Sequence, residues 1–112
     1  MTVVIKRVYE PPSSDDGIRV LVDRLWPRGL SKAAAGVGEW LRDLAPSNEL
    51  RRWYHSHPSE WGAFRKKYLR ELLKPECQKA LQRLFELANE NKRLTLLFAS
   101  KNEALNNAVV LQ

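Results

Sequence analysis

The segment VLVDRLWPRG, residues 20–29, places ionisable side chains directly after an apolar run. Its reactive members are Asp23, Arg24 and Arg28. The guanidinium of arginine presents a planar fork of donors that binds phosphate or carboxylate groups through paired hydrogen bonds. A carboxylate beside such a group can orient it, or can act as a general acid or base. These residue types predict an anion-binding site, with Asp23 as the candidate catalytic residue.

The same residues also suit a purely structural role, in which Asp23 pairs with Arg28, or Arg24 pairs with Asp43. A partly buried arginine requires some partner, because an unpaired buried charge is strongly destabilising. An internal carboxylate meets that requirement as well as a ligand does. The excess of basic over acidic groups in this region favours a ligand, and both interpretations stay open.

The apolar patterns along the chain predict alternating strands and helices. Residues 2–9, 18–26 and 94–99 read as strands, and the last two lack polar alternation, as strands covered on both faces do. Residues 37–45 fit a fourth strand. Helices are expected at the turn 31–36 and after four N-terminal signals, which are Ser47, Ser59, Pro75 and Ser100. The pattern predicts one α/β domain over residues 1–112, a three-layer sandwich with a small, mostly parallel sheet of about four strands flanked by helices.

In open sheets of this kind, ligands bind at the carboxyl ends of the strands. Pro27 and Gly29 are expected to end the second strand. The charged side chains beside them should therefore lie at this edge of the sheet. Two expected helix N-termini lie there as well, and their free N–H groups favour phosphate or carboxylate. Beside Asp23, the candidate ligand-binding residues are Tyr9, Arg24, Trp26, Arg28, Ser47, Ser100 and Lys101. We expect them to bind a phosphate-bearing small molecule or a nucleotide, whether or not the protein is an enzyme.

The charge of the chain also favours anionic partners. Nineteen lysines and arginines against thirteen acidic residues give a net charge of +6, and a basic surface of this kind attracts nucleic acid, nucleotides or acidic proteins. The run Arg65, Lys66, Lys67, Arg70 and Lys74 forms a basic face on one helix. The alternative function is therefore a non-catalytic nucleic-acid-binding module, and a third is a regulatory domain that binds an acidic protein. An ordinary solvated helix surface explains the same run.

Other residues that carry chemistry give weaker signals. His55 and His57 are two positions apart on a helix and would not face the same way, so no metal site is expected. No cofactor motif, such as a glycine-rich phosphate loop, is present. The four tryptophans could stack on bases, but core packing explains them better. Cys77 reads as a small core residue.

The compartment can also be predicted from the sequence. A single cysteine cannot form an internal disulfide, which fits a reducing cytoplasm. No apolar run approaches the roughly 20 residues of a membrane span, and the first residues lack the apolar stretch of a signal peptide. We expect a cytoplasmic protein that does not associate with membranes.

An ordered set of motifs resembles a known family. These motifs are KRVY at residues 6–9, DGIRVLVDRLWPRG at 16–29, EWL at 39–41, APSNEL at 45–50 and LTLLFASKN at 94–102. They cover nearly the whole chain and resemble the YeaO-like branch of the domain-of-unknown-function family 488 (DUF488). The resemblance implies a small bacterial cytoplasmic α/β domain and carries no assigned activity. Its signature residues include Lys6, Gly17 and Arg19 in addition to most of the candidate site.

Overall fold

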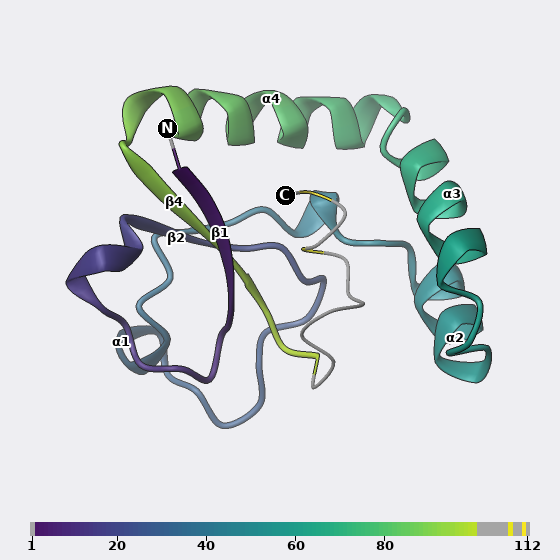
Figure 1. The fold of residues 1–112 in the computed structure, drawn as a ribbon, viewed down its shortest axis with the longest axis horizontal. Coiled ribbons are helices and arrows are strands. Elements are labelled where there is room, and N and C mark those ends of the chain that lie inside the picture. The colour runs from purple at the N-terminus through teal and green to yellow at the C-terminus, as the bar shows by residue number, and fades with distance from the viewer. Residues whose placement is uncertain (1, 101–107, 109–110, 112) are drawn as a thin grey trace.

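The computed structural model describes residues 2–100, 108 and 111. Four strands form one all-parallel sheet: β1 (Thr2–Arg7), β2 (Ile18–Leu21), β3 (Glu39–Trp40) and β4 (Arg93–Phe98). The helices are α1 (Lys32–Ala35), α2 (Asn48–Ser56), α3 (Trp61–Glu71) and α4 (Pro75–Glu90) (Figure 1). Two 3₁₀ turns, Ser14–Asp16 and Arg42–Leu44, complete the described elements. The predicted α/β class with a parallel sheet is confirmed.

The last strand in the chain lies in the middle of the sheet, whose order is β1-β4-β2-β3. Leu94 of β4 pairs with Val3 on one side and with Ile18 on the other. All five residues from Leu94 to Phe98 are buried, because the strand has neighbours on both edges and cover on both faces. The prediction of a strand covered on both faces is confirmed for this segment.

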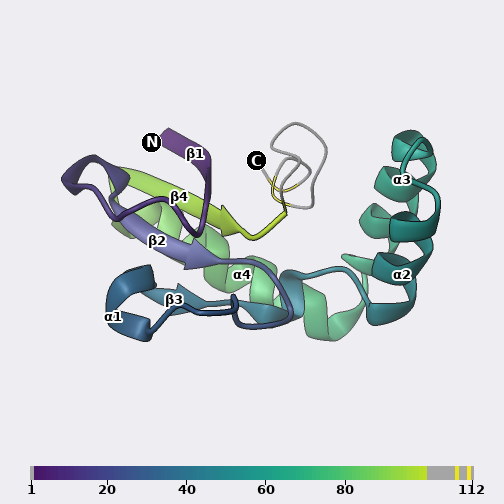
Figure 2. The same cartoon turned by 90° about the horizontal axis from the view of Figure 1, so that it is seen from below.

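Each face of the sheet has its own apolar layer. Leu94, Leu96 and Phe98 point to the side covered by α4, where they join the larger core cluster. Leu21 and Leu97 point to the opposite side, which is covered by α1 and the loop that follows β2. Figures 1 and 2 show α4 and α1 on opposite sides of the sheet. The predicted three-layer arrangement is confirmed, and its second covering layer consists of the short helix α1 and the loop that follows β2.

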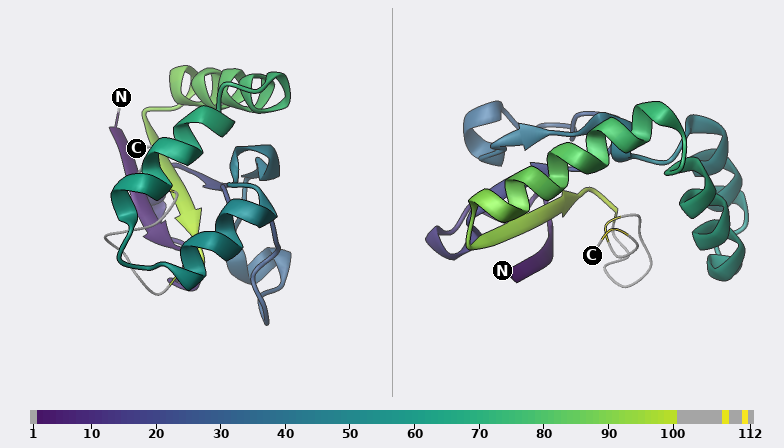
Figure 3. Two further views of the ribbon diagram at one scale, coloured as in Figure 1. Left: turned by 90° about the vertical axis from the view of Figure 1, so that its right-hand side faces the viewer. Right: turned by 90° about the horizontal axis from the view of Figure 1, so that it is seen from above.

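The pair α2 and α3 does not cover a face of the sheet. It stands beyond the carboxyl ends of β2 and β4 (Figures 2 and 3). The pair is anchored to the larger core cluster through Leu50 of α2 and through Phe64 and Tyr68 of α3. The hydroxyl of Tyr68 donates a hydrogen bond to the carbonyl of Leu44, which fixes α3 to the 3₁₀ turn beside the sheet. This placement makes the pair a wall facing the strand ends.

Several boundaries differ from the sequence predictions. The strand predicted to end at residue 26 stops at Leu21, and the last ladder-like bond beyond it runs from the amide of Val22 to the carbonyl of Leu97. The segment 37–45 is a strand only at Glu39–Trp40 before it turns. The cap predicted at Ser59 is wrong by one position, since α3 is preceded by Glu60. The predictions for Ser31, Gly36, Ser47 and Pro75 at helix ends are confirmed.

The amino end of β2 contains a buried ion network that the sequence did not reveal. The guanidinium of Arg19 donates to the carboxylate of Asp16 at 2.6 Å, and the ammonium of Lys6 lies 3.1 Å from the same carboxylate. Burial raises the pKa of Asp16, but hydrogen bonds from Arg19, from the amide of Ser13 and from Lys6 outweigh it and hold the pKa below its usual value. The hydroxyl of Thr95 on β4 donates a hydrogen bond to the Asp16 carbonyl at 2.6 Å, which links the central strand to this network.

The helices give no sign of a membrane span. Within the part of the chain that the structure describes, no helix is both long enough and apolar enough to cross a bilayer. The predicted helix after Ser100 falls almost wholly outside the described residues.

Candidate functional site

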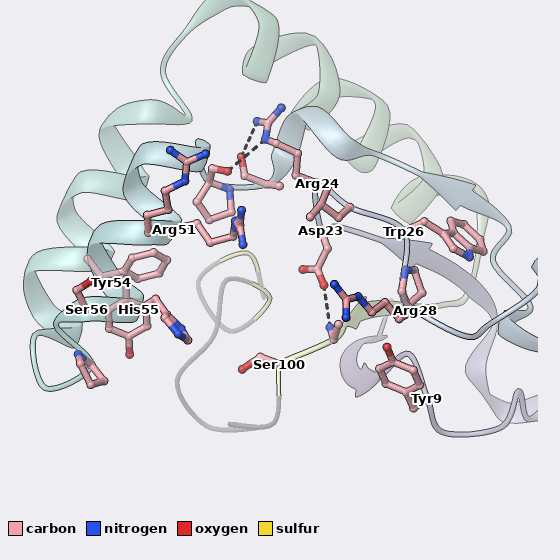
Figure 4. Close-up of a pocket in the computed structure, with 18 residues that line it drawn as sticks. Tyr9, Asp23, Arg24, Trp26, Arg28, Arg51, Tyr54, His55, Ser56 and Ser100 are labelled. Carbon is pink, nitrogen blue, oxygen red and sulfur yellow. Dashed lines mark hydrogen bonds between the residues drawn. The ribbon is translucent and has the colours of Figure 1, made fainter.

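A cavity of about 1160 Å³ lies between the carboxyl ends of the strands and the wall formed by α2 (Figure 4). One side is the segment that follows β2, and the other side is α2. Phe64 of α3 also belongs to the lining. Its lining also includes Ala45, Pro46 and Ala99. Of the residues predicted for the site, the cavity brings together Tyr9, Asp23, Arg24, Trp26, Arg28 and Ser100.

Asp23 connects backbone segments that border the cavity through two hydrogen bonds. Its carboxylate accepts a hydrogen bond from the amide of Ala99 at 2.8 Å, and its carbonyl accepts one from the indole of Trp40 at 2.7 Å. These bonds join the segments that follow β2 and β4 to the end of β3. The half-buried carboxylate is thus a fixed negative group beside the cavity, and its most direct physical role is to position the strand ends.

Arg24 binds backbone rather than a carboxylate. Its guanidinium donates to the carbonyls of Pro46 at 3.4 Å and Ala45 at 3.3 Å. In the described part of the chain it forms no ion pair with Asp43. Neutral carbonyls satisfy the hydrogen-bonding geometry but carry no counter-charge. Arg24 also lines a smaller pocket together with the acidic residues Asp43, Glu71 and Glu76. Arg24 therefore lines the cavity with a guanidinium that is already engaged by backbone carbonyls.

Arg28 is the most available of the predicted arginines. It is exposed, it lines the cavity, and it forms no hydrogen bond or ion pair with any residue that the structure describes. The alternative of a pair between Asp23 and Arg28 is thus not realised within the described residues. An exposed guanidinium at a concave surface can bind a ligand without first breaking an internal contact.

Two aromatic residues of the predicted site form its rigid side. The indole of Trp26 donates to the carbonyl of Leu30 at 2.7 Å, and its ring meets Trp40 edge-on at 5.5 Å between centroids. The ring of Tyr9 lies 5.2 Å from the guanidinium of Arg7, which in turn donates to the carbonyls of Ala99 and Ser100. The tryptophan is therefore pinned as a structural wall, as the core-packing interpretation expected.

Ser47 does not lie in this cavity. It caps α2 as predicted, with its hydroxyl accepting from the amide of Leu50 at 3.1 Å. The carboxylate of Glu71 occupies the same end of the helix, accepting from the Ser47 amide at 2.8 Å and from its hydroxyl at 2.5 Å. An internal carboxylate therefore takes the place that the sequence analysis gave to a ligand anion. Lys101 lies outside the described residues.

The wall formed by α2 adds cavity residues that the sequence analysis did not assign: Arg51, Arg52, Tyr54, His55 and Ser56. The signal available in the sequence was the adjacent pair Arg51 and Arg52 one turn after a helix cap. Its relevance depended on α2 standing opposite the strand ends. The order of the strands and the direction of the α2–α3 pair decide that, and neither can be read from local patterns.

The other candidates are accounted for by local packing. His57 shares a 2.8 Å hydrogen bond with the carbonyl of Trp53 and stacks on its ring, while His55 lines the cavity. The described residues hold no cluster of His, Cys, Asp and Glu suited to a metal ion. Cys77 is a buried free thiol, and burial, followed by the nearby carboxylates of Glu76 and Glu71, raises its pKa. That shift favours a neutral core thiol over a nucleophile.

Comparison with known proteins places the chain in a family. The model of the inactive DUF488-N3 subclade matches residues 2–112. The chain is 42% identical over 111 residues to the uncharacterized protein YeaO of Escherichia coli (strain K12), covering 99% of this chain and 94% of YeaO. It is also 42% identical over 109 residues to the uncharacterized protein Rv3073c of Mycobacterium tuberculosis (strain ATCC 25618 / H37Rv), covering 97% and 89%. No solved structure matches significantly. The protein is therefore a member of the DUF488 family, in its inactive DUF488-N3 subclade.

Proposed function

We propose that this protein binds a phosphate-bearing small molecule or nucleotide in the cavity at the carboxyl ends of its strands. One observation carries the proposal: among the described residues that line the cavity there are four arginines and a single carboxylate, Asp23. That carboxylate already accepts a hydrogen bond from the Ala99 amide. Arg28 and Arg52 form no hydrogen bond or ion pair with another described residue, so their donors remain available to an anion.

The arrangement favours binding without turnover. Asp23 is the candidate acid or base, yet it is engaged by the backbone and its clearest role is to hold the strand ends together. The description of the matched family as inactive supports the same conclusion. The cationic cavity would then act as a receptor for an anion that is made or consumed elsewhere. The buried free thiol of Cys77 is in keeping with a reducing cytoplasm as the proposed compartment.

Thermal unfolding in the presence of pyrophosphate, ribose 5-phosphate and AMP tests this proposal. A ligand at 100 times its Kd stabilises a protein by about 2.7 kcal/mol, which raises the Tm of a domain of this size by about 10 °C. Arg28→Ala should weaken binding about 10-fold or more, because charged hydrogen bonds are worth about 1.5–3 kcal/mol. Arg52→Ala should act in the same direction.

Arg65→Ala is the matched control, since Arg65 is an exposed arginine on α3 and does not line the cavity. All three variants should unfold within about 0.5 kcal/mol of the parent, because surface substitutions rarely exceed that. The proposal fails if none of the anions stabilises the parent protein at millimolar concentration. It also fails if Arg65→Ala weakens binding as much as Arg28→Ala does.

A second candidate function is nucleic-acid binding through the basic face of α3. Arg65, Lys66, Lys67 and Arg70 are all exposed on this helix. Contacts from such a face to phosphates would be insensitive to sequence and sensitive to salt. A gel-shift series with a duplex oligonucleotide from 50 to 200 mM salt should then show affinity falling steeply, and Lys66→Ala should reduce the slope by about one unit. Affinity that stays flat across that range excludes this function.

A further inference from the structure

We infer that the phosphate-bearing ligand is a nucleotide, held with its base against the Tyr54 side of the cavity and its phosphate among the arginines. The inference rests on the proposed function and deepens it. The cavity joins two kinds of lining that one ligand would have to match: cations at Arg28, Arg51 and Arg52, and a largely apolar remainder. A phosphate alone would use only the first.

The apolar lining is stiff. Its more accessible apolar members, Leu25, Trp26, Tyr54 and Pro58, are accompanied by the buried prolines Pro27 and Pro46 and by the buried ring of Phe64. Such a surface binds planar apolar groups well because little conformational freedom is lost on contact. A sugar phosphate would leave it against water, whereas an aromatic base would cover it.

Tyr54 is the aromatic side chain best placed to contact a base. Its ring stacks on Phe64 with centroids 4.3 Å apart and planes at 23°, so it is supported from behind. Phe64 is itself packed against Trp61 and Tyr68. Burial raises the pKa of the Tyr54 phenol, which keeps its hydroxyl a neutral donor near pH 7. That hydroxyl has no hydrogen-bond partner among the described residues.

The tryptophans do not offer an equivalent surface. The ring of Trp53 is covered by the ammonium of Lys67 at 3.8 Å and by the stacked ring of His57 at 5.0 Å. Trp40 lies under the guanidinium of Arg42 at 4.1 Å. Trp26 is held edge-on against Trp40. This leaves Tyr54, and on the far side of the cavity Tyr9, as the candidate stacking surfaces.

The position of Tyr54 on α2 also relates the base to the phosphate. Arg51 precedes Tyr54 by three residues, so the two side chains lie on the same side of the helix. Arg28 projects from the opposite wall (Figure 4). A ligand that stacks on Tyr54 would therefore have guanidinium donors on the same helix and across the cavity, as a base joined to a charged phosphate requires.

Isothermal titration with AMP and with ribose 5-phosphate tests the inference, because the two probes differ only in the base. The other three nucleoside monophosphates complete the panel. At least one nucleotide should bind about 10-fold or more tightly than ribose 5-phosphate, in line with the effect of one base-stacking contact. Tyr54→Leu should remove that advantage while leaving ribose 5-phosphate binding unchanged, and Tyr54→Phe should retain most of it. Phe85→Leu is the control: Phe85 is an exposed aromatic residue on α4 that does not line the cavity, so its loss should leave the advantage intact. Tyr9→Leu tests the alternative placement of the base.

The outcomes separate the two proposals. Equal affinity for ribose 5-phosphate and every nucleotide, with loss of both in Arg28→Ala, overturns the inference and keeps the proposed function. Failure of every probe to bind overturns both. Loss of the nucleotide advantage in Tyr9→Leu, with Tyr54→Leu behaving like the parent, overturns the placement of the base. If Tyr54→Leu does not fold, the comparison of probes on the parent protein still decides whether the base is recognised.

Discussion

Replacing Asp16 with alanine should lower the free energy of unfolding by about 3–5 kcal/mol, the range measured when one partner of a buried ion pair is removed. The Arg19 side chain is only 4% exposed and its shortest contact is the 2.6 Å bond to Asp16. Without that carboxylate, Arg19 would keep bonds to the carbonyls of Ala35 and Glu10 but no counter-charge. Lys6 would lose its acid as well. Urea denaturation followed by circular dichroism measures the effect.

Asp15→Ala is the control for this experiment. Asp15 precedes Asp16 in the same 3₁₀ turn but is exposed, so its loss should change the free energy of unfolding by no more than about 0.5 kcal/mol. Asp16→Asn should fall between the two, because an amide oxygen can still accept from Arg19 but carries no charge. Equal stability of Asp15→Ala and Asp16→Ala would show that the network contributes little.

The same network predicts how stability depends on pH. The pKa of Asp16 is lower in the folded protein than in the unfolded chain, so the folded state favours the ionised carboxylate. The stabilisation is complete above the unfolded pKa of about 4 and is lost as the pH falls through the folded value. Between neutral pH and about pH 3, the parent should therefore lose stability more steeply than Asp16→Asn. Parallel curves would contradict the assignment.

The sequence revealed those features of the fold that depend on local patterns. The apolar run of β4 marked a strand covered on both faces, and Ser31, Ser47 and Pro75 marked helix starts because their chemistry satisfies or omits the first amide donors. The short β3 was overestimated. Two glycines and a 3₁₀ turn at Arg42–Leu44 interrupt its pattern, and only the neighbouring β2 shows where pairing ends.

The candidate site was harder to predict because its contacts join distant segments. Arg24 binds carbonyls that lie 21 and 22 residues further along the chain, and no side-chain pattern encodes a backbone acceptor. Ser47 was correctly read as a helix cap, but nothing local indicated that Glu71, 24 residues away, would occupy it. The sequence therefore identified most of one wall of the cavity and missed the other.

The signature residues of the family resemblance divide by role in the structure. Lys6 and Arg19 belong to the buried network around Asp16, at the amino end of β2. Arg28 lines the cavity beyond the carboxyl end and has no ion pair among the described residues. A motif that runs through β2 thus combines a group that stabilises the fold with a group available to a ligand. Sequence similarity alone cannot separate these roles, whereas the two sets of variants can.

Gly17 connects the buried network to β2, and its backbone geometry excludes other residues. Its φ of 65° and ψ of −140° place it in a region that is essentially restricted to glycine. A Cβ at this position would also collide with the backbone carbonyl of Arg93, at the start of the central strand. Relief of the collision would require β2 and β4 to move apart at the point where their pairing begins.

Gly17→Ala should consequently cost about 3–5 kcal/mol, from about 1–3 kcal/mol of backbone strain and a similar amount of overpacking. Because small domains are stable by only about 5–15 kcal/mol, the variant should unfold at much lower urea concentration or fail to accumulate as folded protein. Gly29→Ala separates the two contributions: Gly29 also has a positive φ, 77°, but an added Cβ there would meet no atom within 4 Å. It should cost only about 1–2 kcal/mol, the strain alone. If the two variants are equally destabilised in urea, the contact with Arg93 does not constrain the sheet, and Gly17 is needed only for its turn.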